Sequence, residues 1–191
     1  MNRRTALIAV AAVLLAIVAI VIGWKLGRKR EMEDLPKAEA PASDVIDGPT
    51  VLAELFFPGQ GGRLFVEERE IPQEGEIETQ LGRLLDALLT GPESPDLYPA
   101  LPAEITTDWI HLNPRGIVYI DLAIAGETPF PAWGSRWEML AVYSVVNTVM
   151  ANIPEISGVV ILRNGQQQPS FAGHLDTSRP LLANQNLVAS N

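Results

Sequence analysis

The sequence predicts an α+β domain in which two helices pack on one small sheet, mixed or mostly antiparallel, preceded by a transmembrane helix. Short apolar runs bounded by glycine and proline indicate strands, and two longer segments have apolar residues at helical spacing. An uncharged run near the N-terminus is typical of a membrane span. The predicted organisation is a basic-flanked anchor at residues 1–30, a flexible linker at 31–49, a folded domain at 50–178 and a loose C-terminal tail at 179–191.

The predicted anchor is the run at residues 5–24, which contains no charged residue. At ~1.5 Å per residue it spans about 30 Å, the thickness of the hydrocarbon core of a bilayer. The run exits through Gly23-Trp24-Lys25-Leu26, which lacks the small residues of a signal-peptidase site, so we expect an uncleaved anchor. The basic residues at Lys25 and 28–30 outnumber Arg3 and Arg4, which weakly favours a cytoplasmic C-terminal flank.

The charge of the remaining chain restricts its partners. Beyond residue 30 there are 8 basic and 23 acidic residues, a net charge of −15. Nucleic-acid binding needs a basic footprint, so we expect no nucleic-acid partner, and the domain is not suited to lie on an anionic membrane surface. The chain has no cysteine, which excludes disulfides, thiolate nucleophiles, cysteine-based zinc sites and a lipid-modified cysteine.

The elements of the folded domain are predicted from apolar residues that recur either at every second residue, as in a strand, or at helical spacing. A run at 51–57 and a charged, alternating run at 63–71 indicate a hairpin whose second strand is an edge. The helix at 75–90 ends at Gly91-Pro92, a strong stop signal. The later predicted elements are strands at 106–112 and 117–122, a helix at 135–152, a strand at 159–162 and a last short element at 171–176.

The second helix carries the most detailed local prediction. Ser135 and Glu138 have the spacing of a capping box, in which each side chain accepts a backbone N–H of the first turn. One apolar stripe is expected along this helix, formed by Met139, Tyr143, Val146 and Met150. Two tryptophans, Trp133 and Trp137, flank the helix start; core packing is expected for them, with an exposed aromatic patch as the alternative.

The polar residues do not assemble a catalytic pattern. His111, His174, Asp176 and Glu138 carry the imidazole and carboxylate groups that acid–base or metal sites need, but no zinc spacing links them. Ser135 and Ser144 lie outside any Gly-x-Ser-x-Gly elbow, and the glycines at 59–62 precede a strand without the Lys-Ser/Thr of a phosphate loop. We therefore predict no enzyme, no cofactor and no metal; the alternative is an extracytoplasmic hydrolase or small-ligand-binding domain using His111, His174 and Asp176.

Eight short motifs in order resemble the GerMN domain, the module of spore-germination and sporulation proteins. They cover about residues 50–178. The matching segments are Leu55-Phe56-Phe57-Pro58, Glu67-Glu68-Arg69-Glu70-Ile71, residues 84–92 around Leu88-Leu89-Thr90-Gly91-Pro92, Leu101-Pro102, residues 116–122, residues 138–149, residues 159–165 and Gly173-His174-Leu175-Asp176.

The resemblance implies a non-enzymatic domain on membrane-anchored or lipid-anchored proteins outside the cytoplasm. Such a domain is similar to the ring-building modules of sporulation assemblies, which act through protein–protein contacts. We therefore expect a single-pass membrane protein, anchored through residues 5–24, whose domain lies outside the cytoplasm and binds other envelope proteins or itself. The sequence departs from that family setting in having one copy of the domain and a membrane span in place of a lipidated cysteine.

Overall fold

The computed structural model describes residues 48–124 and 134–190. The predicted membrane span at 5–24 and nearly all of the linker lie outside these residues, as does Trp133. Within the described ranges, no helix is long and apolar enough to cross a membrane.

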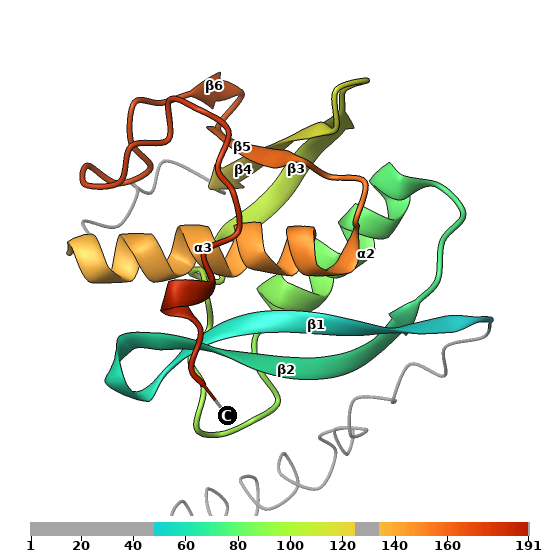
Figure 1. Cartoon of the computed structure of the whole chain (residues 1–191), viewed down its shortest axis with the longest axis horizontal. Coiled ribbons are helices and arrows are strands. Elements are labelled where there is room, and N and C mark those ends of the chain that lie inside the picture. The colour runs from blue at the N-terminus through green and yellow to red at the C-terminus, as the bar shows by residue number, and fades with distance from the viewer. Residues whose placement is uncertain (1–47, 125–133, 191) are drawn as a thin grey trace, which may run out of the picture. The chain divides into compact units, whose positions relative to one another are not determined.

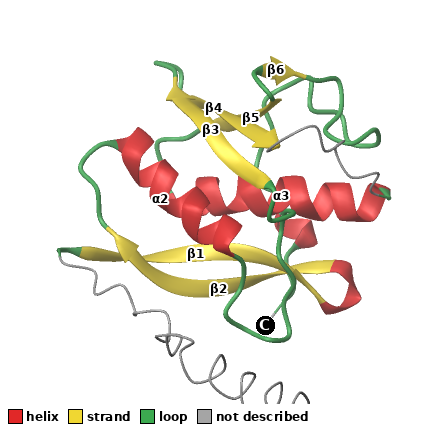
Figure 2. Ribbon diagram, turned by 180° about the vertical axis from the view of Figure 1, so that it is seen from behind, coloured by secondary structure: helices red, strands yellow, loops and turns green. Residues whose placement is uncertain are grey.

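The domain has three layers, with two helices between two sheets (Figures 1 and 2). One outer layer is a two-stranded hairpin and the other is a sheet of four strands. In chain order the elements are β1 (Thr50–Gly59), η1 (Gln60–Gly62), β2 (Arg63–Pro72), α2 (Ile77–Thr90), β3 (Ile105–Leu112), β4 (Ile117–Ile124), α3 (Ser135–Asn152), β5 (Gly158–Arg163), β6 (Gln166–Gln167) and η2 (Gln185–Leu187).

The prediction of an α+β domain with two helices and a mixed sheet is confirmed, but the prediction of one sheet is wrong. The four-stranded sheet has the order β3-β4-β5-β6, with β4 and β5 parallel and the other two pairs antiparallel. The hairpin β1–β2 pairs with none of these strands. Strand periodicity does not reveal which strands share a sheet, and here α3 needs apolar partners on more than one side.

The helix α3 is the centre of the core. Its residues 140–142 and 144–149 are all buried, whereas Met139, Tyr143 and Met150 of the predicted apolar stripe are only partly buried. The buried face is therefore wider than the predicted stripe and centred elsewhere on the helix. A helix with so wide a buried face belongs inside a protein, and α3 lies between β1 and the four-stranded sheet (Figure 1). The helix α2 contributes a narrower apolar face to the same core through Leu81, Leu84, Leu85 and Leu88, and it ends as predicted at Gly91, whose φ is 93°.

Two side chains of α3 complete the outer edge of β1. Asn152 accepts the Glu54 N–H at 2.9 Å and donates to the Glu54 carbonyl at 2.8 Å. The buried Thr148 hydroxyl accepts the Phe56 N–H at 3.0 Å. Since unpaired buried backbone groups are costly, these two polar residues allow a strand edge to pack directly against a helix.

The C-terminal segment after Ser178 is packed, so the prediction of a loose tail is wrong. Leu181 exchanges two backbone hydrogen bonds with Val159 of β5, at 2.7 and 2.9 Å. Further along, Asn184 bonds to Asn147 of α3. The Ala189 N–H then donates to the Leu64 carbonyl of β2 at 2.8 Å. The segment therefore links β5, α3 and β2. Its apolar residues follow neither strand alternation nor helical spacing, which is why the sequence did not predict that they pack.

The last predicted element, at 171–176, is not a strand. Ser170, just before it, and Asp176, its last residue, form an isolated antiparallel bridge around a loop. A two-residue strand, β6, forms instead at Gln166–Gln167 by pairing with the end of β5. A short polar run of this kind has no hydrophobic alternation that would predict a strand.

Candidate functional site

Glu138 is the most completely enclosed ionisable residue in the described part of the domain, with 0% of its surface exposed. Its carboxylate lies in the first turn of α3 and accepts backbone N–H groups from Ala172 at 2.7 Å, His174 at 2.8 Å and Leu175 at 3.1 Å. The His174 ring also approaches it, with Nδ1 2.9 Å from Oε2. The carboxylate thus organises the loop that follows β6.

This arrangement replaces the predicted capping box, which is wrong. The N-cap of α3 is Gly134, and no side chain caps the helix. Ser135 is exposed, and the Glu138 carboxylate turns to a loop 34 to 37 residues later in the chain. That loop carries amides that have no partner in a sheet, and a charged acceptor satisfies several of them at once.

The electrostatics of Glu138 are set by two opposing effects. Burial by itself raises the pKa of the Glu138 carboxyl because the charged form loses its solvation. The N–H groups of Ala172, Leu175 and His174, together with the His174 side chain, stabilise the charged form and bring the pKa below its ordinary value. Glu138 is therefore a carboxylate at neutral pH, with its acceptor capacity committed to the loop.

We expect this carboxylate to make the free energy of unfolding depend on pH in the acidic range. A group whose folded pKa is depressed stabilises the fold above its unfolded pKa of ~4.3 and loses that contribution as pH falls through the folded pKa. The variant Glu138→Gln should be less stable than the wild type at pH 7, and the difference should narrow as pH falls below about 4. Urea unfolding curves measured from pH 7 to pH 2.5 check this; parallel curves for the two proteins would contradict it.

The other predicted site residues lie apart from this pair. His111, in β3, has Nδ1 3.2 Å from Glu78 of α2 and stacks on Trp109, with ring centroids 5.6 Å apart. Asp176 accepts the backbone N–H and the hydroxyl of Ser178, which lowers its pKa. The structure brings Glu138 and His174 together, but places the other two residues in separate local contacts.

The remaining sequence candidates are structural. Ser144 is buried in α3 and donates its hydroxyl to the Leu140 carbonyl at 2.8 Å. The glycines at 59–62 form the turn of the first hairpin, where Gly61 has φ 69°. In the ranges 48–124 and 134–190, no group of three or more acidic or histidine side chains is placed to hold a metal ion.

A second polar cluster, which the sequence did not predict, joins β2 to the end of α2. Arg69 donates to the Ala87 and Gly91 carbonyls, each at 2.9 Å, and pairs with Glu67. Glu67 in turn accepts the N–H groups of Glu93 and Ser94. Burial acts to raise the pKa of Glu67, but these amides and Arg69 bring it below its ordinary value. A positive side chain at the C-terminus of a helix satisfies its free carbonyls.

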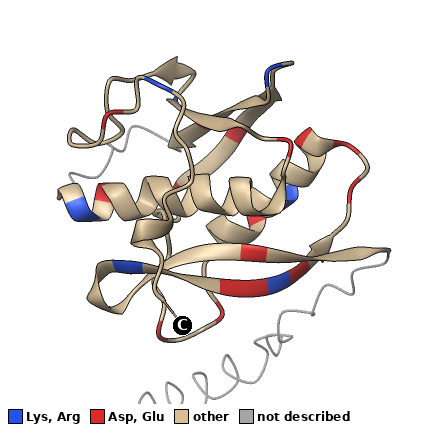
Figure 3. Ribbon diagram, viewed as in Figure 1, with Lys and Arg blue, Asp and Glu red and all other residues tan. Residues whose placement is uncertain are grey.

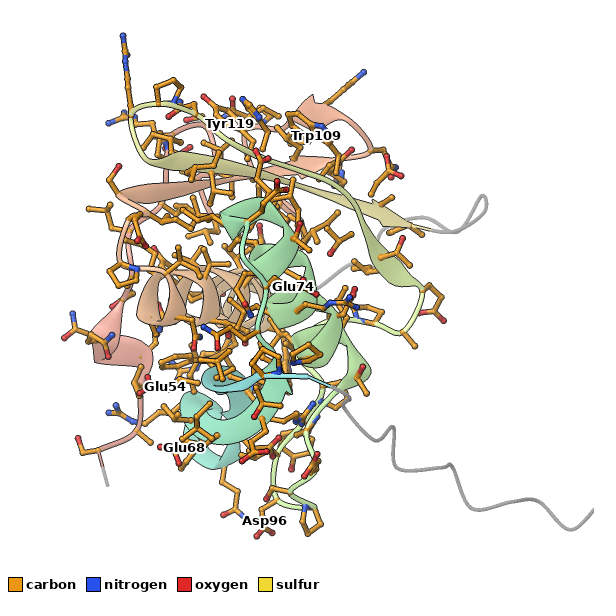
Figure 4. The ribbon with its side chains drawn as sticks, turned by 90° about the vertical axis from the view of Figure 1, so that its right-hand side faces the viewer. Glu54, Glu68, Glu74, Asp96, Trp109 and Tyr119 are labelled. Carbon is orange, nitrogen blue, oxygen red and sulfur yellow. The ribbon has the colours of Figure 1, made fainter. Side chains whose placement is uncertain are left out.

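Large aromatic side chains remain at the surface. Tyr98 and Trp137 pack edge to face with ring centroids 6.2 Å apart, and they are 48% and 50% exposed. Core packing of Trp137 is thus wrong, and the exposed alternative holds for this residue. Trp109 is 48% exposed on β3; Figure 4 shows it with Tyr119 on the side of the domain opposite Glu54 and Glu68.

The fold and these clusters define a small α+β domain that exposes aromatic side chains and in which buried or partly buried ionisable residues hold loops and a helix end. The family model described as Germane, sporulation and spore germination, matches residues 54–169, more than half of the chain. The chain therefore belongs to the Germane family, whose module is also called the GerMN domain, and the recognition made from the sequence motifs is confirmed.

Solved structures with the same fold come from two bacteria. A candidate lipoprotein of Clostridium perfringens is 23% identical, with a TM-score of 0.51 over 80% of this chain and 100% of that one. The first GerMN domain of the sporulation protein GerM from Bacillus subtilis is 20% identical, with a TM-score of 0.54 over 71% of this chain and 99% of that one. The tandem domains of GerM are 19% identical, with a TM-score of 0.54, and the match covers 70% of this chain and 46% of theirs. Among curated proteins, no sequence matches the chain.

Proposed function

We propose that this protein is a non-catalytic, single-pass membrane protein of the cell envelope, linked to sporulation or germination. Its Germane domain lies outside the cytoplasm, is tethered by residues 31–49 and binds other envelope proteins or a second copy of itself. The family description supports the link to sporulation and germination. The uncharged run at 5–24 and the likeness to a candidate lipoprotein support the envelope location.

The observation that carries a binding role is the exposed aromatic pair formed by Tyr98 and Trp137. Trp137, on which Tyr98 packs, lines a hollow of about 230 Å³ together with residues 99–102 and Ala141. Trp and Tyr are enriched among the residues that dominate protein–protein binding energy, since each offers a large rigid contact area. Glu138, by contrast, has its carboxylate occupied by loop amides, which argues against a role as an acid or base.

Crosslinking in native membranes tests the binding role. A photocrosslinking residue at Trp137 should give discrete adducts, whether with another envelope protein or with a second copy. The same photocrosslinking residue placed at Arg115, which is exposed in the turn between β3 and β4, serves as the control. Repeated failure to recover any protein adduct at Trp137, self-association included, would count against the proposal.

Protease accessibility tests the orientation. With the domain outside the cytoplasm, protease added to intact spheroplasts should digest the domain without prior lysis. Digestion that requires lysis would place the domain in the cytoplasm, as the basic residues at 25–30 weakly favour.

A further inference from the structure

A cleft of about 420 Å³ opens at the end of the domain where β1 begins, between the start of α2 and the end of α3. Apolar residues of β1, of α2 and of the segment just after α3 line it: Val51, Leu52, Ile77, Leu84, Ile153 and Pro154. Val51 and Leu52 are 39% and 56% exposed. Exposed apolar side chains that border a concave surface mark an interaction site more than a scattered exposed leucine does.

The backbone of β1 is open beside this cleft. Thr148 and Asn152 of α3 bond the edge groups of Phe56 and Glu54, and α3 ends at Asn152. Since edge-facing positions alternate along a strand, Leu52 turns its N–H and carbonyl to the same side as Glu54. No side chain of the described residues bonds these two groups of Leu52. An extended segment of a partner could therefore pair with the free N–H and carbonyl of Leu52, as the Asn152 side chain pairs with those of Glu54.

The face of the hairpin next to the cleft is acidic. Glu54 lies directly opposite Glu68, and Leu52 lies opposite Glu70. Because the Glu54 N–H points away from β2, the pair with Glu68 is a non-hydrogen-bonded one, the closer of the two antiparallel spacings, and like charges in such a pair are destabilising. Figure 3 shows acidic residues on both strands, and Figure 4 shows Glu54 and Glu68 on the same side of the domain.

Among the described residues, neither Glu54 nor Glu68 has a basic partner within ion-pair distance. Further acidic side chains, Glu74 and Glu155, line the cleft, and Arg83 pairs with Glu74. The negative charge of this surface thus remains largely uncompensated within the domain. A partner that brings positive charge would relieve the repulsion between Glu54 and Glu68 and gain attraction at the same time.

We propose that this surface binds an extended, basic segment of another protein that alternates Lys or Arg with apolar residues. Its backbone adds to β1 at Leu52, its apolar side chains enter the cleft, and its basic side chains lie over Glu54 and Glu68. The charge selects this occupant over the tether of the same chain, because residues 31–49 contain six acidic residues and one lysine. The inference rests on the proposed binding function and names the surface and the partner chemistry.

The test uses the full chain in micelles of a non-ionic detergent and a fluorescein-labelled peptide of alternating Lys and Val, six residues long. Fluorescence anisotropy should show saturable binding that weakens at 0.5 M NaCl, where exposed charges are screened beyond ~4 Å. A Glu-Val peptide and a Lys-Ser peptide of the same length should each bind at least about tenfold more weakly, because the first lacks the charge and the second lacks the apolar side chains. Empty micelles measure the background.

Variants separate binding from folding. Glu54→Gln with Glu68→Gln should weaken Lys-Val binding about five- to tenfold, since two exposed charge pairs are lost. The same double variant should keep or raise the melting temperature, because it removes the repulsion between the strands. Leu52→Ser should also weaken binding. The matched control Glu104→Gln with Asp108→Asn removes two exposed charges from another region and should bind as the wild type does.

Equal loss of binding in both double variants would show a non-specific charge effect and overturn the proposal, as would no saturable binding at all. If peptide binding is lost as the protein concentration rises, self-association covers the surface, and the surface would be assigned to a second copy of the chain. If neutralising the basic residues at 25–30 strengthens peptide binding, these residues compete with the peptide, and the surface would be assigned to this basic segment of the same chain. If envelope adducts at Trp137 persist while the peptide fails to bind, this inference falls and the proposed binding function stands.

Discussion

Replacing Glu138 by alanine is expected to lower the free energy of unfolding by about 3–5 kcal/mol, because three backbone donors lose their acceptor at a cost of about 1–3 kcal/mol for each one that stays unsatisfied. The carboxylate accepts three backbone N–H groups of the loop at 172–175, and the substitution leaves them without an acceptor in a space that water does not reach. It also leaves a cavity of side-chain size at the start of α3. Urea unfolding followed by circular dichroism measures the change.

Two variants show whether the amide bonds are the cause. Glu138→Gln keeps the size and one acceptor oxygen, so its loss should be smaller than that of the alanine variant. His174→Ala removes a side chain that is 47% exposed and leaves the three amide bonds in place, so its loss should be about 1 kcal/mol or less. Equal losses for His174→Ala and Glu138→Ala would show that the imidazole, and not the loop backbone, dominates.

Ending the chain at Ser178 is expected to lower the free energy of unfolding by roughly 3 kcal/mol, the sum of several hydrogen bonds of ~1 kcal/mol each and apolar burial, less the recovered chain entropy. The deletion removes both bonds between Leu181 and Val159 and the bond from Ala189 to Leu64. It also uncovers the small cluster of Phe56, Leu64 and Leu140, against which Leu187 and Val188 pack. The melting temperature should fall accordingly.

A shorter deletion separates the contribution of the pairing with β5 from that of the later contacts. A chain ending at Leu182 keeps the pairing with β5 but loses the contacts with α3 and β2, so its stability should lie between those of the wild type and the longer deletion. If the chain ending at Ser178 unfolds at the same temperature as the wild type, the C-terminal segment contributes nothing to the fold, contrary to the expectation.

Local elements were predictable because local residues determine them. Gly91 and Pro92 end α2 where the sequence predicted, and the hairpin of β1 and β2 has the predicted strands and turn. Alternation and helical period act over a few residues, so they are visible without the fold. The same holds for the family motifs, which follow the order of the elements and led to the correct domain.

The roles of the polar residues were not predictable, because they depend on partners far along the chain. The spacing of Ser135 and Glu138 indicated a helix cap, whereas Glu138 bonds a loop that no local pattern connects to it. Arg69 bonds carbonyls 18 and 22 residues later, at the end of α2. The large apolar side chain of Trp137 suggested core packing, but it lies beside Tyr98 at the surface. Sequence spacing reports neighbours on one element, and these contacts join different elements.

The sequence by itself determined the number and order of the main strands and helices, the family and the absence of cysteine chemistry, since composition and short-range periodicity carry that information. Only the tertiary structure decided that the helices lie between two sheets, that the segment after Ser178 is packed and that Glu138 holds a loop. The physical reason is that burial and long-range hydrogen bonding are properties of the packed chain. The Glu54 and Glu68 pair and the open edge at Leu52 likewise emerge only once β1 and β2 are set in register.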